Sequence, residues 1–426
     1  MRPFIPEPFA LAPRITKFRA ADHLLSVSIV VRAALVPNGT CTLLPKKQQP
    51  GIRKSAGFAD DIGNSPCYGG DLAPFKPRTD FTVNAVGYAP GGGRTSLLRV
   101  SIGCGEWRKS LDLTGDRLWQ RGARVELSEA ASFARMPIRL EHAFGGKTSP
   151  FNPWGKGFGS LKEEPGAKLA AANIHPTGAH TLRWDQQTEP AGFGPLSAAT
   201  QPRLGLRGRH EGGWAQQGGM PPKDFDWGYY NVAPLDQQFR PYWRGDETLF
   251  FENLHPGMPQ FTSELPGLRP RLLIRKTAEN EPQALFEELH PVLDSVHVDT
   301  EAMTVDLGWR AVMSVADDRA ASVTHCMLSV EQLSEPPKPL ADLVAAFQAK
   351  LAPRRLAVPP LPAPPAPDPE ADRKMADSLK EALKDVPLPP ELGAAIQAES
   401  SGARIKRMLD DALAALTTKA PALPEP

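Results

Sequence analysis

Residues 80–104 read DFTVNAVGYAPGGGRTSLLRVSIGC, and this stretch decides the fold class. Residues 80–88 and 96–104 are rich in valine, leucine, isoleucine and aromatic side chains, which favour β-strands. The Pro-Gly-Gly-Gly run at residues 90–93 is a turn signal between them. Residues 106–113 extend the pattern after a second glycine turn. The stretch therefore predicts an antiparallel meander of three strands.

Strand-like segments recur on both sides of a long irregular region. Residues 23–36 read as a strand buried on both faces. Further candidate strands are residues 249–252, 271–276, 283–289, 292–298, 302–307, 309–315 and 327–333. Two β-rich regions, 17–149 and 248–335, thus flank an irregular middle at 150–247. We predict a mainly β fold with an antiparallel β-sandwich or barrel-like core, a long irregular middle and a helical C-terminal appendage.

Helical patterns appear only after Pro339. We expect a β-rich domain over residues 1–335, a helix over 336–352, a proline- and alanine-rich linker over 353–369 and helices over 370–418. Asp368 before Pro369 is a typical helix start. Helices of this length are marginal alone in water, so their apolar stripes must pack on one another, on the β core or on a partner.

The composition of the 426-residue chain argues against several classes of function. Lysine plus arginine total 49 and aspartate plus glutamate total 48, so the basic excess typical of nucleic-acid binders is missing. No apolar run is long enough to span a membrane, and the first residues lack an apolar signal core. The four cysteines lack zinc or redox spacing. We expect a cytoplasmic protein with no metal, no cofactor and no nucleic-acid or membrane partner.

The segment 58–83 combines acids, bases, glycines and prolines in one long, shaped loop. Its acids Asp60, Asp61 and Asp71 have two interpretations. Clustered carboxylates can bind a hard metal or act in acid–base chemistry. They can instead cap turns and pair with local bases such as Lys76 and Arg78. The second interpretation is favoured, because no histidine or glutamate ligand recurs at a fixed interval here.

Glu141 and His142 form a second candidate for chemistry. A glutamate–histidine dyad can act as a general base, although such pairs more often make structural hydrogen bonds. The alternative function is therefore a cytoplasmic hydrolase or transferase that uses Asp60, Asp61, Glu141 or His142. Convergence of these side chains in one cleft would favour an enzyme, whereas a broad aromatic surface groove would favour a binding protein.

The aromatic-rich run at residues 224–231 reads DFDWGYYN and differs in kind from the loop. Large aromatic side chains beside polar ones are typical of binding hot spots. The same side chains can equally fill a core under the irregular middle. Trp243 and Arg244 follow closely in the sequence, and they too can belong either to a binding surface or to the core.

A series of short motifs carries a family resemblance. The motifs are the loop 58–83, GDRLW at 115–119, MPIRLEHAFGG at 136–146, NPWGKG at 152–157, AGFGPL at 191–196, DFDW at 224–227, NVAPLDQQ at 231–238 and LPGLRP at 265–270. Through them the chain resembles, from about residue 17 to about residue 275, the family catalogued as domain of unknown function twenty-one sixty-nine. These are accessory proteins found with type VI secretion systems.

The resemblance implies a non-catalytic adaptor, or chaperone, that helps load a toxin effector onto the secretion spike. The implied partners are a type VI secretion effector and a spike (VgrG) or PAAR-type tip protein. The residues that we predict to bind a partner are Asp60, Asp61, Asn64, Tyr68, Asp71, Lys76, Arg78, Glu141, His142, Phe225, Asp226, Trp227, Tyr230, Asn231, Gln237, Gln238, Trp243 and Arg244.

Overall fold

The structure, a computed structural model, divides the chain into two units, Met1–Ala352 and Pro353–Pro426. The described residues are 1–17, 22–60, 63–159, 161, 163–179, 183–186, 188–208, 221–276, 285–316, 323–351 and 368–417. Strands dominate the first unit, so the predicted mainly β class is confirmed.

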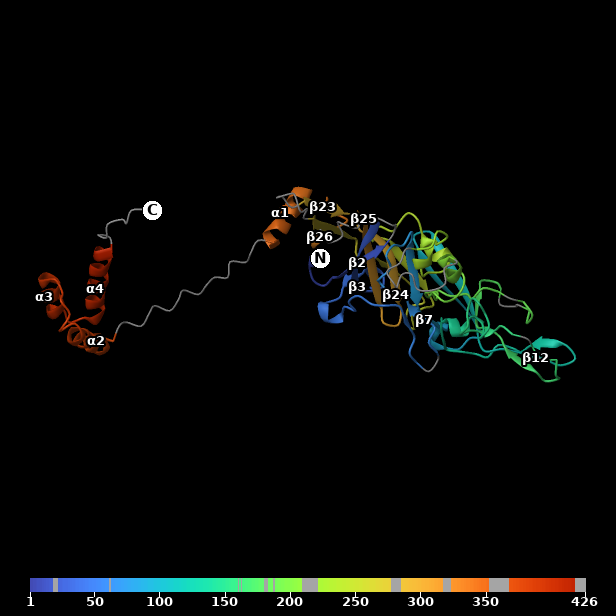
Figure 1. Ribbon diagram of the computed structural model, residues 1–426. Helices are drawn as coiled ribbons and strands as arrows, with labels where there is room; N and C mark the ends of the chain where they lie inside the picture. The colour runs from blue at the N-terminus through green and yellow to red at the C-terminus, as the bar shows by residue number, and fades with distance from the viewer. Residues whose placement is uncertain are drawn as a thin grey trace. The chain divides into compact units, whose positions relative to one another are not determined.

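Three large sheets build the first unit (Figure 1). The seven-stranded sheet has the order β19 (Gln238–Phe239), β8 (Thr79–Asn84), β24 (Val292–Asp299), β25 (Thr304–Ala316), β3 (Asp22–Ala34) and β2 (Ala10–Lys17), with β5 (Thr42–Leu43) also on β3. The six-stranded sheet has the order β18 (Ile174–Pro176), β11 (Trp107–Thr114), β10 (Leu97–Cys104), β20 (Thr248–Glu252), β21 (Gln260–Glu264) and β4 (Gly39–Thr40). The four-stranded sheet has the order β1 (Arg2–Phe4), β26 (Val323–Gln332), β22 (Leu268–Lys276) and β23 (Leu285–Leu289).

Short elements complete the first unit. A three-stranded sheet joins β13 (Val125–Leu127), β12 (Leu118–Arg121) and β17 (Lys168–Ala170). Two-stranded pairs join β14 (Arg135–Pro137) with β9 (Val86–Tyr88), β15 (Phe144–Gly145) with β16 (Lys156–Gly157), and β6 (Ala56–Gly57) with β7 (Pro66–Tyr68). Single 3-10 turns are η1 (Lys46–Gln48), η2 (Pro90–Gly92), η3 (Leu140–His142), η4 (Arg203–Arg207), η5 (Trp227–Tyr230) and η6 (Leu235–Gln237).

The main core lies between the seven-stranded and six-stranded sheets. Alternate side chains of each strand point to one face, so Ile29 and Val31 of β3 and Leu307 of β25 share it. They pack in one cluster with Ile102 of β10 and Phe251 of β20. Each such side chain that is fully buried contributes about 1.5–3 kcal/mol. The first unit is therefore a β-sandwich, and no sheet in its described part closes into a barrel.

The same face of β3 continues toward the four-stranded sheet. Leu25 and Val27 pack with Leu272 and Ile274 of β22. The first helix, α1 (Leu340–Leu351), covers the other side of that sheet with its buried apolar residues. These are Leu343 and Phe347, which cluster with Leu273 and Met327. The helix predicted at 336–352 is thus part of the first unit.

The predicted meander is wrong in its first turn. Residues 80–88 do not pair with 96–104, because the turn η2 carries the chain from one sheet to another. Strand β8 pairs in parallel with β24, and β9 pairs with β14. The second turn is right, since β10 and β11 form an antiparallel hairpin from Leu97↔Thr114 to Cys104↔Trp107.

The described residues of the second unit, 368–417, form three helices, α2 (Pro369–Ala382), α3 (Pro390–Ala398) and α4 (Gly402–Thr417). They pack on one another around Ala376, Ile396 and Ile405, one from each helix. Asp368 caps α2 as expected, because its carboxylate accepts a 3.0 Å hydrogen bond from the Glu370 amide.

Candidate functional site

The second face of the seven-stranded sheet carries charged side chains, and the 53–80 loop covers them. Asp306 of β25 accepts two hydrogen bonds from Arg32 of β3, at 2.6 and 2.9 Å, and one from Arg53 of the loop at 2.6 Å. Burial alone would raise the pKa of Asp306, but the hydrogen bond from Arg32 and the charge of Arg53 hold it below its usual range. Asp306 is therefore an anchor for the loop.

A second anchor lies beside it on the same sheet. Arg310 of β25 donates to the Asp294 carboxylate at 2.6 Å and to the Ser28 hydroxyl at 2.6 Å. It also donates to the backbone carbonyls of Asp71 and Ala73 in the loop. Arg310 and Asp294 are both buried. The guanidinium thus ties the loop backbone to two strands at once.

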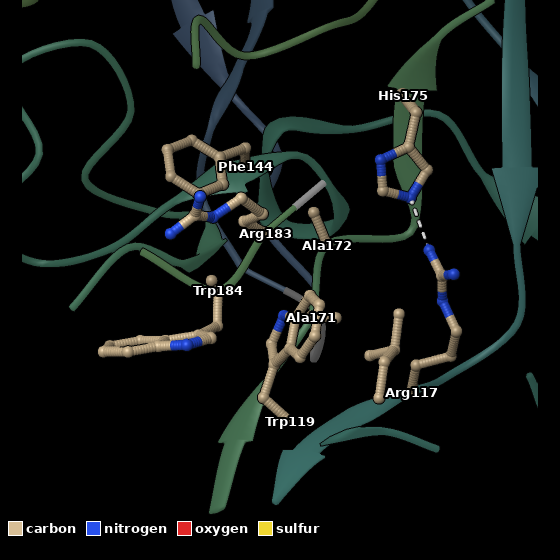
Figure 2. Close-up of a pocket in the computed structure, with 10 residues that line it drawn as sticks. Arg117, Trp119, Phe144, Ala171, Ala172, His175, Arg183 and Trp184 are labelled. Carbon is tan, nitrogen blue, oxygen red and sulfur yellow. Dashed lines mark hydrogen bonds between the residues drawn. The ribbon is translucent and has the colours of Figure 1, made fainter. Parts of the chain in front are cut away.

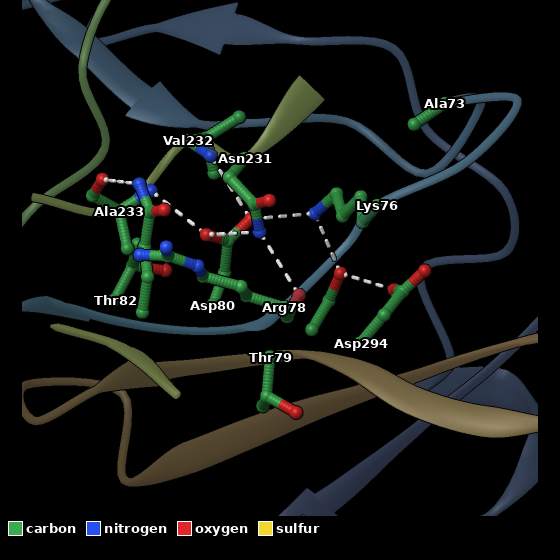
Figure 3. Close-up of polar contacts among 12 residues, drawn as sticks. Ala73, Lys76, Arg78, Thr79, Asp80, Thr82, Asn231, Val232, Ala233 and Asp294 are labelled. Carbon is green, nitrogen blue, oxygen red and sulfur yellow. Dashed lines mark hydrogen bonds and ion pairs between the residues drawn. The ribbon is translucent and has the colours of Figure 1, made fainter. Parts of the chain in front are cut away.

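Asp80 is the third anchor, and Figure 3 shows its contacts. Its carboxylate accepts from Lys76 at 2.9 Å, from the Asn231 side chain at 3.0 Å and from the amides of Val232 and Ala233 at 2.9 and 3.2 Å. Charge-assisted bonds of this kind are roughly twice as strong as neutral ones. Asp80 therefore fixes the loop and the segment after η5 relative to each other.

Hydrogen bonds to the Asp71 carboxylate connect two parts of the loop. This carboxylate accepts from the Tyr68 hydroxyl at 2.5 Å and from the Arg53 amide at 2.7 Å. The Arg53 guanidinium lies 3.6 Å from the centre of the Tyr68 ring. Burial raises the pKa of Tyr68, so its hydroxyl stays protonated and donates. Gly70 has φ +84°, and a Cβ there would lie 2.6 Å from the Ser55 amide nitrogen, so this close approach requires glycine.

A wide groove of about 760 Å³ runs along this covering loop. Its walls come from three segments: residues 54–57 with 64–73, residues 196–199 with Arg203, and the tyrosines of η5. The side chains and backbone that line it belong to Arg14, Lys54, Ser55, Ala56, Gly57, Asn64, Pro66, Tyr68, Gly69, Gly70, Leu72, Ala73, Leu196, Ser197, Ala198, Ala199, Arg203, Tyr229 and Tyr230. The loop residues among them belong to the segment that the three anchors hold.

The aromatic segment forms one cluster beside the groove. The Phe225 ring packs edge-on to Trp227 at 5.3 Å and to Tyr230 at 5.9 Å between ring centres. Trp227 stacks on Tyr230 at 6.0 Å and meets Phe75 of the loop. All of these rings are half-buried. Tyr229 and Tyr230 of this partly exposed cluster line the groove.

The acids and the histidine of the enzyme hypothesis have separate partners. Glu141 accepts hydrogen bonds from the amide and hydroxyl of Ser65, at 2.8 and 2.7 Å. His142 faces Asn173 at 3.3 Å, and burial lowers its pKa. Asp60 forms an ion pair with Arg139 at 2.5 Å. Asp61 lies outside the described residues. Within the described part of the chain, no group of three or more potential ligands forms a metal site.

A separate pocket is lined by residues of β12, β13, β15, β16 and β18 and by residues beside these strands (Figure 2). Trp119, Phe144 and Trp184 surround it, and Arg117 donates toward His175 at 3.1 Å. Its volume is about 20 Å³. That is about the room one water molecule needs.

The family model described as "Uncharacterized protein conserved in bacteria (DUF2169)" matches residues 20–310. The chain belongs to this family. No protein with a curated description and no solved structure matches it. The family segment contains the loop, its anchors and the groove except Arg14. Helix α1 and the second unit lie beyond the family segment.

The structure divides the predicted partner-binding residues into three sets. Asp71, Lys76, Asn231, Gln237 and Trp243 are buried, so they support the surface and do not form it. Gln237 donates to the Phe81 and Phe193 carbonyls, and Trp243 packs on Phe81 in the main core. The prediction that these five contact a partner directly is therefore corrected.

The second set surrounds the groove. Asn64, Tyr68 and Tyr230 line it, and Phe225 and Trp227 adjoin it. Asp226 caps η5 by accepting from the Gly228 amide.

The third set lies elsewhere. Asp60, Glu141 and His142 have the partners given above, and Gln238 donates to the Ala233 carbonyl. Arg78 is exposed, and Arg244 pairs with Asp246 at 3.1 Å.

Sequence reasoning missed the charged anchors and the groove cations. These are Arg14, Arg32, Arg53, Lys54, Arg203, Asp294, Asp306 and Arg310. A signal for the anchors exists, because Asp306 and Arg310 alternate with apolar residues in a strand whose two faces are buried. No comparable signal marks Arg203, because it lies in the irregular middle.

Proposed function

We propose that the protein is a non-catalytic cytoplasmic adaptor that binds a toxin effector and helps load it onto a type VI secretion spike. The observation that carries the binding role is the groove of about 760 Å³ bordered by a half-buried aromatic cluster. Partly exposed tyrosine and tryptophan rings are among the side chains that dominate binding energies. The secretion role comes from the family resemblance.

The arrangement of the acids supports binding over catalysis. Glu141 and His142 point to different partners, Ser65 and Asn173. A general base needs a reacting group within hydrogen-bond reach and a neighbour that orients it. The described acids of the loop instead hold loop backbone and local bases. No helix of the described residues is long and apolar enough to cross a membrane.

The test begins with capture from the native host. Tagged full-length protein is purified under native conditions, and the bound proteins are identified by mass spectrometry. We expect a toxin effector whose secretion stops when the gene for this protein is deleted. A secretion assay that is unchanged by the deletion would contradict the proposal.

One groove residue then links the function to the site. Tyr230→Ala should weaken binding of that effector by about 2 kcal/mol or more, roughly thirtyfold, if the ring is central to the interface. The matched control is Tyr88→Ala, because Tyr88 of β9 is also half-buried but does not line the groove. Thermal melting of both variants separates a lost contact from a lost fold. Full-strength binding by a normally folded Tyr230→Ala protein would exclude this groove as the binding site.

A further inference from the structure

The described residues that line the groove carry positive charge and no negative charge. Arg14, Lys54 and Arg203 line it, and among the described lining residues none is an aspartate or a glutamate. The whole chain is nearly balanced, with 49 basic and 48 acidic residues. The excess in the groove is therefore local and is not a general property of the surface.

The two arginines are held by neutral oxygens. Arg14 donates to the Leu72 carbonyl at 2.6 Å. Arg203 donates to the carbonyls of Leu196, at 2.7 Å, and Tyr229, at 3.0 and 2.8 Å. Carbonyl dipoles orient a guanidinium but leave its full charge in place. These bonds therefore orient the two guanidinium groups in the groove without neutralising their charge.

The carboxylate that acts on Arg203 is already occupied. Burial lowers the pKa of Arg203, and the charge of Asp80 opposes this shift. Asp80 itself binds Lys76, Asn231 and two backbone amides below the groove. An anion that enters the groove from solvent thus meets Arg203 without displacing an existing ion pair.

Tyr230 lies under the influence of both arginines. Burial raises the pKa of its hydroxyl to about 12, while the charges of Arg14 and Arg203 lower it. The hydroxyl is thus protonated at neutral pH, so it can donate a hydrogen bond in the groove that Tyr230 lines. A carboxylate in the groove would accept charge-assisted hydrogen bonds from the lining cations.

The groove walls suit an extended chain. Ala56 and Gly57 form the exposed strand β6, which within the described residues pairs only with β7. Small side chains at residues 197–199 line the groove as well and leave room for a backbone. Exposed strand edges of this kind accept an added strand through main-chain hydrogen bonds.

We propose that the groove binds an extended acidic segment of the effector, whose carboxylates meet Arg14, Lys54 and Arg203. This inference deepens the adaptor function and rests on it. A nucleic acid is the less favoured occupant, because nucleic-acid binders carry a broad basic excess and this chain does not. The three cations are too few for a phosphate track, but they match a short run of carboxylates.

The probe is a short fluorescein-labelled peptide of alternating glutamate and serine, measured by anisotropy with the full-length protein. A peptide with glutamine in place of glutamate is its neutral counterpart. We expect the glutamate peptide to bind more tightly, and added salt to weaken its binding. Equal binding of the two peptides would overturn the proposal.

Lys54 offers a clean substitution, because its side chain is exposed. Lys54→Glu should weaken binding of the glutamate peptide about fivefold, the effect of about 1 kcal/mol at an exposed site. Lys54→Gln should have a smaller effect in the same direction. The matched control is Lys168→Glu on β17, which makes the same charge change outside the groove. An equal effect of Lys54→Glu and Lys168→Glu would also overturn the proposal.

Three outcomes separate the possible failures. If Tyr230→Ala loses the captured effector while Lys54→Glu and salt leave its binding unchanged, the acidic segment is wrong and the adaptor function stands. If the deletion leaves secretion unchanged, the adaptor function itself fails. Tighter binding of a single-stranded DNA oligonucleotide than of the glutamate peptide, with the same Lys54→Glu sensitivity, would overturn the choice of a protein segment.

Discussion

Other parts of the first unit cover both faces of the seven-stranded sheet, but different interactions hold those parts in place. On one face, Ile29 and Leu307 pack against the six-stranded sheet in an apolar core. On the other, Asp306 and Arg310 hold the 53–80 loop through ion pairs and hydrogen bonds. Apolar packing depends on area and shape, whereas the polar face depends on specific partners. The polar face therefore orders a loop that has little apolar surface of its own.

This difference explains why the groove lies where it does. A loop with many glycines and prolines cannot bury enough apolar surface to be fixed by packing alone. The anchors at Asp80, Asp294 and Asp306 supply the missing order and leave the outer side of the loop for binding. Three predictions test the contrast between the two faces.

The largest loss of stability is expected from a substitution on the polar face. Arg310→Met leaves Asp294 buried without its guanidinium partner and removes the bonds to the loop carbonyls. Loss of one member of a buried ion pair costs about 3–5 kcal/mol. Urea unfolding followed by tryptophan fluorescence measures this in the first unit, because every tryptophan precedes residue 353.

The double variant Asp294→Asn/Arg310→Met is the control for this effect. Because the two residues share one interaction, the double variant should lose clearly less stability than the sum of the single variants. Additive losses would show that the ion pair does not hold the loop.

A smaller loss is expected on the apolar face. Leu307→Ala removes a fully buried side chain from the main core and should cost about 3 kcal/mol. Val312→Ala on the same strand is the matched control, because its side chain is 37% exposed and should cost about 0.5 kcal/mol or less. Equal losses for the two variants would contradict the placement of the core on this face.

The smallest expected loss of stability depends on pH, and it distinguishes the polar face of the sheet from the apolar face. His297 of β24 contacts the Thr82 hydroxyl at 2.9 Å and the Asn84 side chain at 3.3 Å. Burial lowers the pKa of His297 to about 4, with Asp306 opposing the shift and Arg53 adding to it. Between about pH 4 and the ordinary histidine pKa near 6.5, His297 binds a proton in the unfolded chain but not in the folded chain. Stability is thus full above about pH 6.5 and falls as the pH drops toward 4.

From pH 7 to pH 5 this histidine should remove about 2 kcal/mol of stability. Urea unfolding at the two pH values measures the loss in the wild type and in His297→Gln. The variant should lose about 2 kcal/mol less than the wild type over this interval, whereas Leu307→Ala should keep the wild-type pH dependence. An equal acid loss in His297→Gln and the wild type would show that His297 does not sense pH.

Much of the fold could be predicted from local patterns. The apolar run at 23–36 and the alternation at 292–298 correspond to β3 and β24. The N-cap at Asp368 correctly marks the start of α2. These features depend on residues near one another in the chain, and their physics acts over a few positions. The pairing of β8 with β24 could not be predicted, because more than 200 residues separate the paired positions Asp80 and Ser295.

The candidate site was predicted in part. The density of glycine, proline and charge marked the 58–83 loop, and the aromatic run marked the wall around Tyr230. The roles within them were not predictable, because burial decides them. Asp71 and Lys76 looked like surface charges in the sequence, yet they are buried beneath the groove.

The sequence by itself determined the mainly β class, the positions of several long strands and helices and the family, because periodicity, caps and motifs are local properties. Only the tertiary structure decided that Arg32, Arg53 and Asp306 meet over one sheet face, and that Arg14 and Arg203 face one groove. The physical reason is that a strand shows which residues share a face but not what covers that face. Long-range pairing and burial turn an alternating polar position into either a solvated charge or a buried anchor.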